Sequence, residues 1–186
     1  MKKAVYFAVF LSVTAMLVTA IAFLGYSITA PTIEQNRIDS INKNIAILYS
    51  AEDGLISNSD LPENAYQEKD YKLISAVYEV LDSTGKIHAI IYNVSAQGRN
   101  GLVYALIAVN PYTDTVEAVT YYKHGETPNI GEKYTRDDEI SKLLGQSISN
   151  VVIDVIADAS TTWSAIENMF NEVEKHYAEQ EVHINE

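Results

Sequence analysis

The hydrophobic positions of this 186-residue chain begin with a long apolar segment. From Ala4 to Tyr26 there is no charged residue. As an α-helix, this segment would extend about 34 Å, enough to cross the roughly 30 Å hydrocarbon core of a bilayer. A cleaved signal peptide is the alternative, but its apolar region is about 7–15 residues long and precedes a small-residue cleavage site. The sequence SITAPTIE offers no such site, so we expect residues 1–30 to be a membrane anchor that contacts lipid through residues 4–26.

A second apolar pattern, with a helical period, follows Pro31. Spacings of three and four residues place its members on one helix face: Ile38, Ile41, Ile45 and Leu48. Gly54 is a suitable C-terminal cap. Residues 55–70 are polar and contain one proline, which is typical of a loop. We expect residues 31–72 to form an amphipathic stalk helix followed by this loop.

From residue 73 the pattern changes to short apolar runs separated by turns. It predicts four strands, Ala76–Leu81, Lys86–Val94, Leu102–Val109 and Val116–Tyr122. After them we expect a short helix at 136–144, a strand at Val151–Ile156 and a long helix at about 162–180. One face of the long helix is apolar, with Ile166, Met169, Phe170, Val173 and Tyr177. The prediction is an α+β domain over residues 73–186, an antiparallel sheet packed with helices.

The charged residues narrow the possible functions. The chain has 13 Lys and Arg against 25 Asp and Glu, a net charge of −12. This excess of acid argues against nucleic-acid binding, which needs a basic face. The chain has no cysteine, which excludes disulfides and thiolate metal sites, and its four histidines are scattered, so we expect no metal ligands. Lys2 and Lys3 favour a cytoplasmic N-terminus, which places the acidic domain outside the cell.

One loop carries a recognisable motif. Residues 123–131 read KHGETPNIG, which resembles the H-x-E-T-P-G-L-G signature of the FMN-binding domain family. That family includes the G subunit of Rnf-type electron-transport complexes and the C subunit of the sodium-translocating NADH:quinone reductase; the first is the more similar in length. Two weaker features agree: residues 29–33 resemble the family's T-x-P-x-I, and residues 98–103 resemble its G-Y-x-G-x-I.

The resemblance implies an extracytoplasmic domain that holds FMN through a phosphoester, made by a flavin transferase at a D-x-x-S-G-A-[TS] motif. The gapless match is residues 154–160, which makes Ser160 the acceptor. A register with a deletion makes Thr162 or Thr161 the acceptor instead. In the motif loop, the resemblance implies that Thr127, Ile130 and Gly131 contact the flavin and that Glu126 organises the loop.

The acceptor motif departs from the family at two positions. Ala157 replaces a serine, and Asp158 replaces a glycine that permits positive φ, so we expect this freedom of the backbone to be lost. At about 4 Å and an effective dielectric of roughly 20, the Asp158 charge would repel a phosphate by about 4 kcal/mol. Either the loop turns Asp158 outward, or the protein carries no covalent flavin. The hydroxyl residues 160–162 also suit a plain helix N-cap.

We therefore expect a membrane-anchored, single-pass flavoprotein subunit that carries FMN for electron transfer in an Rnf-type ion-translocating complex. It would have no catalytic residues of its own and would act as an electron-transfer subunit rather than as a stand-alone enzyme. Its partners would be other membrane subunits and, for maturation, a flavin transferase. The alternative is a non-redox accessory subunit, or an extracytoplasmic binding module, with a decayed flavinylation motif.

Overall fold

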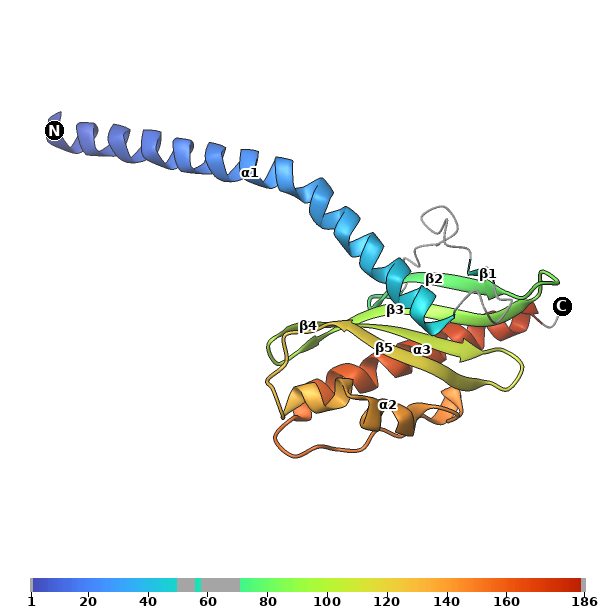
Figure 1. The fold of residues 1–186 in the computed structure, drawn as a ribbon. Coiled ribbons are helices and arrows are strands. Elements are labelled where there is room, and N and C mark those ends of the chain that lie inside the picture. The colour runs from blue at the N-terminus through green and yellow to red at the C-terminus, as the bar shows by residue number, and fades with distance from the viewer. Residues whose placement is uncertain (1, 50–55, 58–70, 185–186) are drawn as a thin grey trace. The chain divides into compact units, whose positions relative to one another are not determined.

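The computed structural model describes residues 2–49, 56–57 and 71–184 (Figure 1). The chain divides into two compact units, Met1–Ile41 and Asn42–Glu186. Helix α1, Lys2–Leu48, begins in the first unit, and its last two turns belong to the second. Gly54, the expected helix cap, and most of the expected loop lie outside the described residues.

The first unit contains the apolar part of α1. It is long and apolar enough to cross a membrane, the one such helix among the described residues. Large apolar side chains are exposed all around it, for example Leu11, Phe23 and Leu24. Exposure on every side is typical of a helix that contacts lipid rather than one that packs on a soluble core. Pro31 lies within α1, and the helix continues past it to Leu48.

The second unit is built on one antiparallel sheet in the order β1-β2-β3-β4-β5. The four predicted strands are present as β2 (Ile74–Leu81), β3 (Ile87–Gly98), β4 (Gly101–Asn110) and β5 (Thr115–Lys123). The tight connection of β3 and β4 pairs Gly98 with Gly101, whose φ of 126° requires glycine. A fifth strand, β1 (Ile56–Ser57), pairs with β2 inside the segment expected to be a loop, so that expectation is wrong at these two residues.

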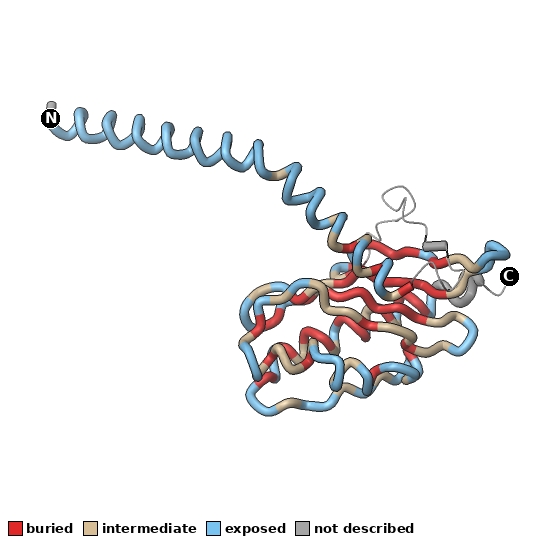
Figure 2. The backbone as a smooth tube through the Cα atoms, in the orientation of Figure 1, coloured by how far each residue is buried: buried red, intermediate tan, exposed pale blue. Residues whose placement is uncertain are grey.

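Helix α3, Ser160–Ile184, covers one face of this sheet (Figure 1). The predicted apolar face of the helix is buried, with each side chain 3% exposed or less: Ile166, Met169, Phe170, Val173 and Tyr177. It packs on alternate residues of the central strands, among them Tyr92, Val94, Ala105 and Ile107. Figure 2 marks the buried residues in red along the strands and along the helix. The predicted α+β fold, an antiparallel sheet with helices packed against it, is confirmed.

Short elements connect β5 to α3. They are the 3₁₀ helix η2 (Gly131–Thr135), helix α2 (Asp137–Leu143) and the 3₁₀ helix η3 (Ile148–Asn150). Helix α2 corresponds to the predicted short helix. The predicted strand at Val151–Ile156 is wrong, because these residues are extended but pair with no strand. Side chains supply their hydrogen bonds instead.

The end of α1 forms part of the second unit. Ile45 and Tyr49 are buried, and the Tyr49 ring lies edge-on to the ring of His88, with centroids 6.0 Å apart. His88 in turn lies 3.2 Å from the Glu117 carboxylate, measured from Nε2 to Oε1. Burial and the nearby Glu117 charge raise the pKa of Tyr49. The apolar side of this amphipathic segment is thus fixed on the domain.

Candidate functional site

A buried carboxylate joins three segments that are far apart in the sequence. Glu126, in the loop after β5, is 6% exposed. Its Oε1 accepts a hydrogen bond from the backbone N–H of Asn100, at 3.2 Å, in the β3–β4 turn. Its Oε2 accepts a hydrogen bond from the hydroxyl of Thr162, which is 2% exposed and lies in the first turn of α3. One side chain therefore connects the turn, the loop and the helix.

Two glycines make room for this carboxylate. A Cβ at Gly98 would collide with Oε1 of Glu126. A Cβ at Gly131 would collide with Oε2 of Glu126, and would lie 2.6 Å from Oγ1 of Thr162. Because these neighbours are themselves buried and bonded, a side chain at either position would displace them. Gly98, which begins the matching segment 98–103, and Gly131, which ends the motif loop, thus share a packing role.

The loop of Glu126–Gly131 is a defined turn. The carbonyl of Thr127 accepts hydrogen bonds from the N–H groups of Ile130, at 3.1 Å, and Glu132, at 3.3 Å. Its hydroxyl oxygen accepts one from the Asn100 side chain, at 2.9 Å, which leaves the hydroxyl proton to be donated elsewhere. Asn129 has a φ of 61°, a left-handed conformation that asparagine tolerates well. The side chain of Ile130 is partly buried and packs on the core.

Glu132 closes this turn electrostatically. Its carboxylate accepts a hydrogen bond from the N–H of Asn129, at 3.1 Å, and pairs with the Arg136 guanidinium, at 3.3 Å. These contacts, the Asn129 bond first, lower the pKa of Glu132. Arg136 also donates to the side-chain oxygen of Asn129, at 2.7 Å. Glu132 thus fixes the backbone of Asn129, and Arg136 fixes its side chain.

The candidate acceptor residues lie at the start of α3. Ser160 is its first residue and is exposed, as is Thr161, whereas Thr162 is buried. Asp158 has a φ of 65° and is exposed. The expectation that Asp158 forbids the backbone conformation of glycine is wrong, because aspartate is among the few residues that adopt the left-handed region. The outward orientation leaves its charge in solvent.

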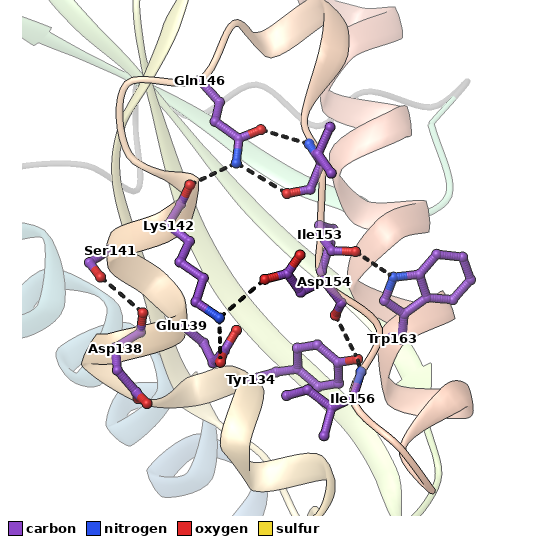
Figure 3. A network of polar contacts seen from close by, with 11 residues as sticks. Tyr134, Asp138, Glu139, Ser141, Lys142, Gln146, Ile153, Asp154, Ile156 and Trp163 are labelled. Carbon is purple, nitrogen blue, oxygen red and sulfur yellow. Dashed lines mark hydrogen bonds and ion pairs between the residues drawn. The ribbon is translucent and has the colours of Figure 1, made fainter.

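Side chains hold the segment that leads to the acceptor (Figure 3). The Tyr134 hydroxyl donates to the carbonyl of Asp154, at 3.1 Å, and accepts from the N–H of Ile156, at 2.8 Å. The Gln146 side chain bonds both the N–H and the carbonyl of Val152, at 2.7 and 3.1 Å. The Trp163 indole donates to the carbonyl of residue 153, at 3.0 Å. These contacts replace the partner strand that residues 151–156 lack.

The motif residue Asp154 has an ionic partner. Lys142 in α2 lies 3.2 Å from its carboxylate and 2.8 Å from that of Glu139. The two contacts, that with Glu139 first, raise the pKa of Lys142. Figure 3 shows the ammonium group between the two carboxylates, with Tyr134 beside them. Asp154 therefore contacts α2, while Ser160, the candidate acceptor six positions later, starts α3.

A cavity of about 210 Å³ lies between α2, β5 and this segment. Apolar side chains of Leu143, Ile153 and Ile166 line it, together with Tyr121, Tyr134 and the charged side chains of Glu139, Lys142 and Asp154. Burial raises the pKa of both tyrosines, so both phenols stay protonated. The Tyr134 proton is donated to the carbonyl of Asp154. The cavity therefore combines an apolar wall with the Lys142 ammonium group and two carboxylates.

The structure brings the predicted residues together in part. Glu126, Gly131 and Thr162 are in direct contact or adjacent, Thr127 is linked to them through Asn100, and Ser160 and Thr161 lie in the same helical turn as Thr162. Sequence reasoning missed the roles of Asn100, Tyr134, Lys142 and Gln146. The one available signal was the glycine-flanked Asn100 turn, because the other contacts are long-range.

Comparison with known proteins gives a match that includes the Glu126 loop and the start of α3. The family model described as FMN-binding domain matches residues 98–175. The chain is 29% identical over 114 residues to the C subunit of the Na⁺-translocating NADH-quinone reductase of Yersinia pestis, covering 51% of this chain and 43% of that protein. It is 38% identical over 72 residues to the corresponding protein from Neisseria meningitidis serogroup B, covering 39% and 28%.

Among solved structures, the chain is similar to the NqrC crystal structure from Shewanella oneidensis, with a TM-score of 0.44, 23% identity, and coverage of 59% of this chain and 62% of that one. The match to the curated relatives spans less than half of their length. The residues matched by the family model include the Glu126 loop and the start of α3. Residues 98–175 of this chain thus match the model of the FMN-binding domain family.

Proposed function

We propose that this protein is a membrane-anchored flavoprotein subunit that carries FMN on its extracytoplasmic domain and transfers electrons within an ion-translocating complex of the Rnf type. The observation that carries this proposal is the junction at Glu126. Within the residues matched to the FMN-binding domain, it fixes the motif loop beside the first turn of α3, where an exposed hydroxyl is available.

Ser160 is the proposed attachment residue. It is exposed at the N-terminus of α3, where the helix dipole and free N–H groups favour a phosphate. Thr162 is a poorer acceptor, because it is buried and its hydroxyl proton is donated to Glu126. Thr161 is exposed but lacks the six-residue spacing to Asp154 that the transferase motif has.

The attachment step needs a flavin dinucleotide as donor and a flavin transferase as enzyme. The Ser160 oxygen attacks the phosphorus next to the riboflavin part, so that a Ser–O–P bond forms and the pyrophosphate P–O bond breaks. The nucleoside monophosphate leaves with the bridging oxygen, and the serine proton passes to solvent. No electron is exchanged. The outward Asp158 does not block this step, because its charge is screened by water.

The flavin ring is proposed to contact the Glu126–Gly131 loop. Thr127 keeps a hydroxyl proton to donate to a ring carbonyl, and Ile130 offers the exposed part of an apolar side chain. Gly131 lets the loop approach the start of α3 closely. When bound, the flavin supplies one- or two-electron redox chemistry, and the chain supplies its position and electrostatic surroundings.

The anchor supports a membrane setting. The exposed apolar surface of α1 fits a lipid environment, and Lys2 and Lys3 favour a cytoplasmic N-terminus with the acidic domain outside. The curated relatives are subunits of a Na⁺-translocating NADH-quinone reductase, as their names state. Other membrane subunits of such an electron-transport complex are the proposed partners.

The test is the mass and absorbance of the full chain, purified after co-expression with a flavin transferase. We expect a flavin spectrum that survives denaturing precipitation, and the added mass of FMN less one water. Ser160→Ala should abolish that mass, and Thr161→Ala should keep it. The result that would overturn the proposal is a wild-type chain that gains no mass while the same transferase modifies another substrate. In that case Ala157 and Asp158 have removed the attachment site, and the non-redox alternative holds.

A further inference from the structure

Glu126 is placed to control the geometry of the acceptor residue without touching it. We propose that Glu126 is a positioning residue: by holding Thr162, its carboxylate fixes the first turn of α3 and so presents the Ser160 hydroxyl to the modifying enzyme. This inference rests on the proposed attachment at Ser160. It adds a role for a buried side chain that lies 36 positions away from Thr162 in the sequence.

The buried Glu126 carboxylate depends on two hydrogen-bond donors. The group is buried, and its two oxygens accept from donors in different segments, the Asn100 N–H and the Thr162 hydroxyl. Among the described residues Glu126 forms no ion pair. Loss of either donor would leave a buried carboxylate oxygen without its hydrogen bond, which destabilises the fold.

The bond to Thr162 determines which way Ser160 faces. Residues two positions apart on an α-helix point in nearly opposite directions, about 200° apart around the axis. With Thr162 turned inward to Glu126, Ser160 is turned outward, as its exposure shows. Rotation or fraying of this turn would move the Ser160 hydroxyl, because the helix backbone connects both residues within one turn.

The same carboxylate also sets the position of the motif loop. It lies against Gly131 at the loop's far end and against Gly98 at the β3–β4 connection. The proposed ring contacts, Thr127 and Ile130, lie between Glu126 and Gly131 in the chain. The loop and the acceptor turn are therefore held in one fixed relation by a single group.

Conservative substitutions separate the hydrogen bond from the packing. Glu126→Gln keeps the shape and an oxygen for Asn100, but its amide nitrogen donates to Thr162 instead of accepting from it. Thr162→Val keeps the shape and removes the hydroxyl, whereas Thr162→Ser keeps the hydroxyl. Glu167→Gln, on a partly exposed position of the same helix, is the matched control for the loss of a carboxylate.

The first measurement is the rate of FMN transfer to the full-length chain by a flavin transferase, followed by intact mass. We expect Glu126→Gln and Thr162→Val each to lower kcat roughly tenfold, with an unchanged KM for the chain, because neither variant keeps the hydrogen bond from the Thr162 hydroxyl to a charged carboxylate. The double variant should be no slower than the slower single variant. Thr162→Ser and Glu167→Gln should react at the wild-type rate.

The second measurement is amide hydrogen exchange over residues 160–166 in the flavin-free chain, which does not depend on the attachment chemistry. Glu126→Gln and Thr162→Val should exchange faster there, and Glu167→Gln should not. Wild-type exchange in both variants would overturn the positioning role, as would unchanged kcat values in a chain that accepts FMN. A chain that accepts no FMN but shows the faster exchange would overturn the attachment at Ser160 and leave the link between Glu126 and α3 established.

Discussion

The backbone N–H of Ile156 donates a hydrogen bond of 2.8 Å to the hydroxyl of Tyr134, which in turn donates to the carbonyl two residues earlier. Tyr134 is 3% exposed and lies in η2, next to the motif loop. The Tyr134 phenol therefore supplies hydrogen bonds to the backbone of residues 154 and 156 that a neighbouring strand would supply in a sheet. The position of the acceptor region depends on a side chain from a distant part of the chain.

Tyr134→Phe tests this dependence. We expect the free energy of unfolding to fall by about 1–3 kcal/mol, because the change leaves a partly buried backbone donor and acceptor without their partner. Denaturant unfolding of the flavin-free chain measures it. Tyr112→Phe, at an exposed tyrosine, is the control and should change stability by less than about 0.5 kcal/mol. Equal stability of the two variants would contradict the role given to Tyr134.

This segment also shows where prediction from sequence fails. The run from Val151 to Ile156 is rich in β-branched residues, a composition that favours strands. Composition does not reveal whether a partner strand is available, and here Tyr134, Gln146 and Trp163 supply the hydrogen bonds. The strands β2–β5 and the apolar face of α3 were predictable because their periodic patterns follow directly from burial on one side.

The site was predictable to a smaller degree. The family resemblance pointed to the motif loop and to the candidate acceptor segment, and both lie within the residues matched by the family model. The bond of Glu126 to Thr162 spans 36 residues, and no local pattern reports such a contact. The left-handed backbone at Asp158 was misjudged, because aspartate was treated as incompatible with the conformation of glycine.

The membrane anchor can be tested at its centre. Leu17→Arg should reduce insertion of α1 by about 2.5–3.5 kcal/mol, the cost of an arginine at the middle of a spanning helix. The measurement is the share of the chain recovered in the membrane fraction, with Leu17→Val as the control. Intact mass should also show that residues 1–30 are retained. A mature chain that starts near Ala30 would show that the segment is a cleaved signal peptide.

The motif loop can be tested for flavin contact. Thr127→Ala and Ile130→Asp should lower the flavin content or shift the reduction potential while circular dichroism shows an unchanged fold, because each removes a proposed contact to the ring. Ser83→Ala, in an exposed turn, is the control. If both loop variants keep the wild-type flavin content and reduction potential, while Tyr121→Phe shifts the flavin spectrum, the ring lies in the cavity beside α2 instead.

Glu132 should make the loop sensitive to acid. Its pKa is lowered in the folded state, first by the Asn129 N–H and further by Arg136, so its contribution to stability is full above the unfolded pKa of about 4.3. That contribution is lost as the pH falls through the lower folded pKa. In unfolding experiments from pH 7 to pH 3, the difference between wild type and Glu132→Gln should shrink toward zero. A difference that stays constant with pH would exclude a role for this carboxylate's charge.

Asp158 allows the effects of charge and backbone conformation to be separated. Because it is exposed, its repulsion of a phosphate about 4 Å away should be near 1 kcal/mol, as in water, and not the larger value of a shielded site. Asp158→Asn removes the charge and keeps a residue that tolerates its φ of 65°. We therefore expect Asp158→Asn to speed FMN transfer to Ser160 by about fivefold with unchanged stability. Asp158→Ala also removes the charge but should lower the free energy of unfolding by about 1 kcal/mol, because alanine adopts the left-handed region at a cost. Transfer rates that are equal in wild type and Asp158→Asn would show that the charge of Asp158 does not reach the transferred phosphate.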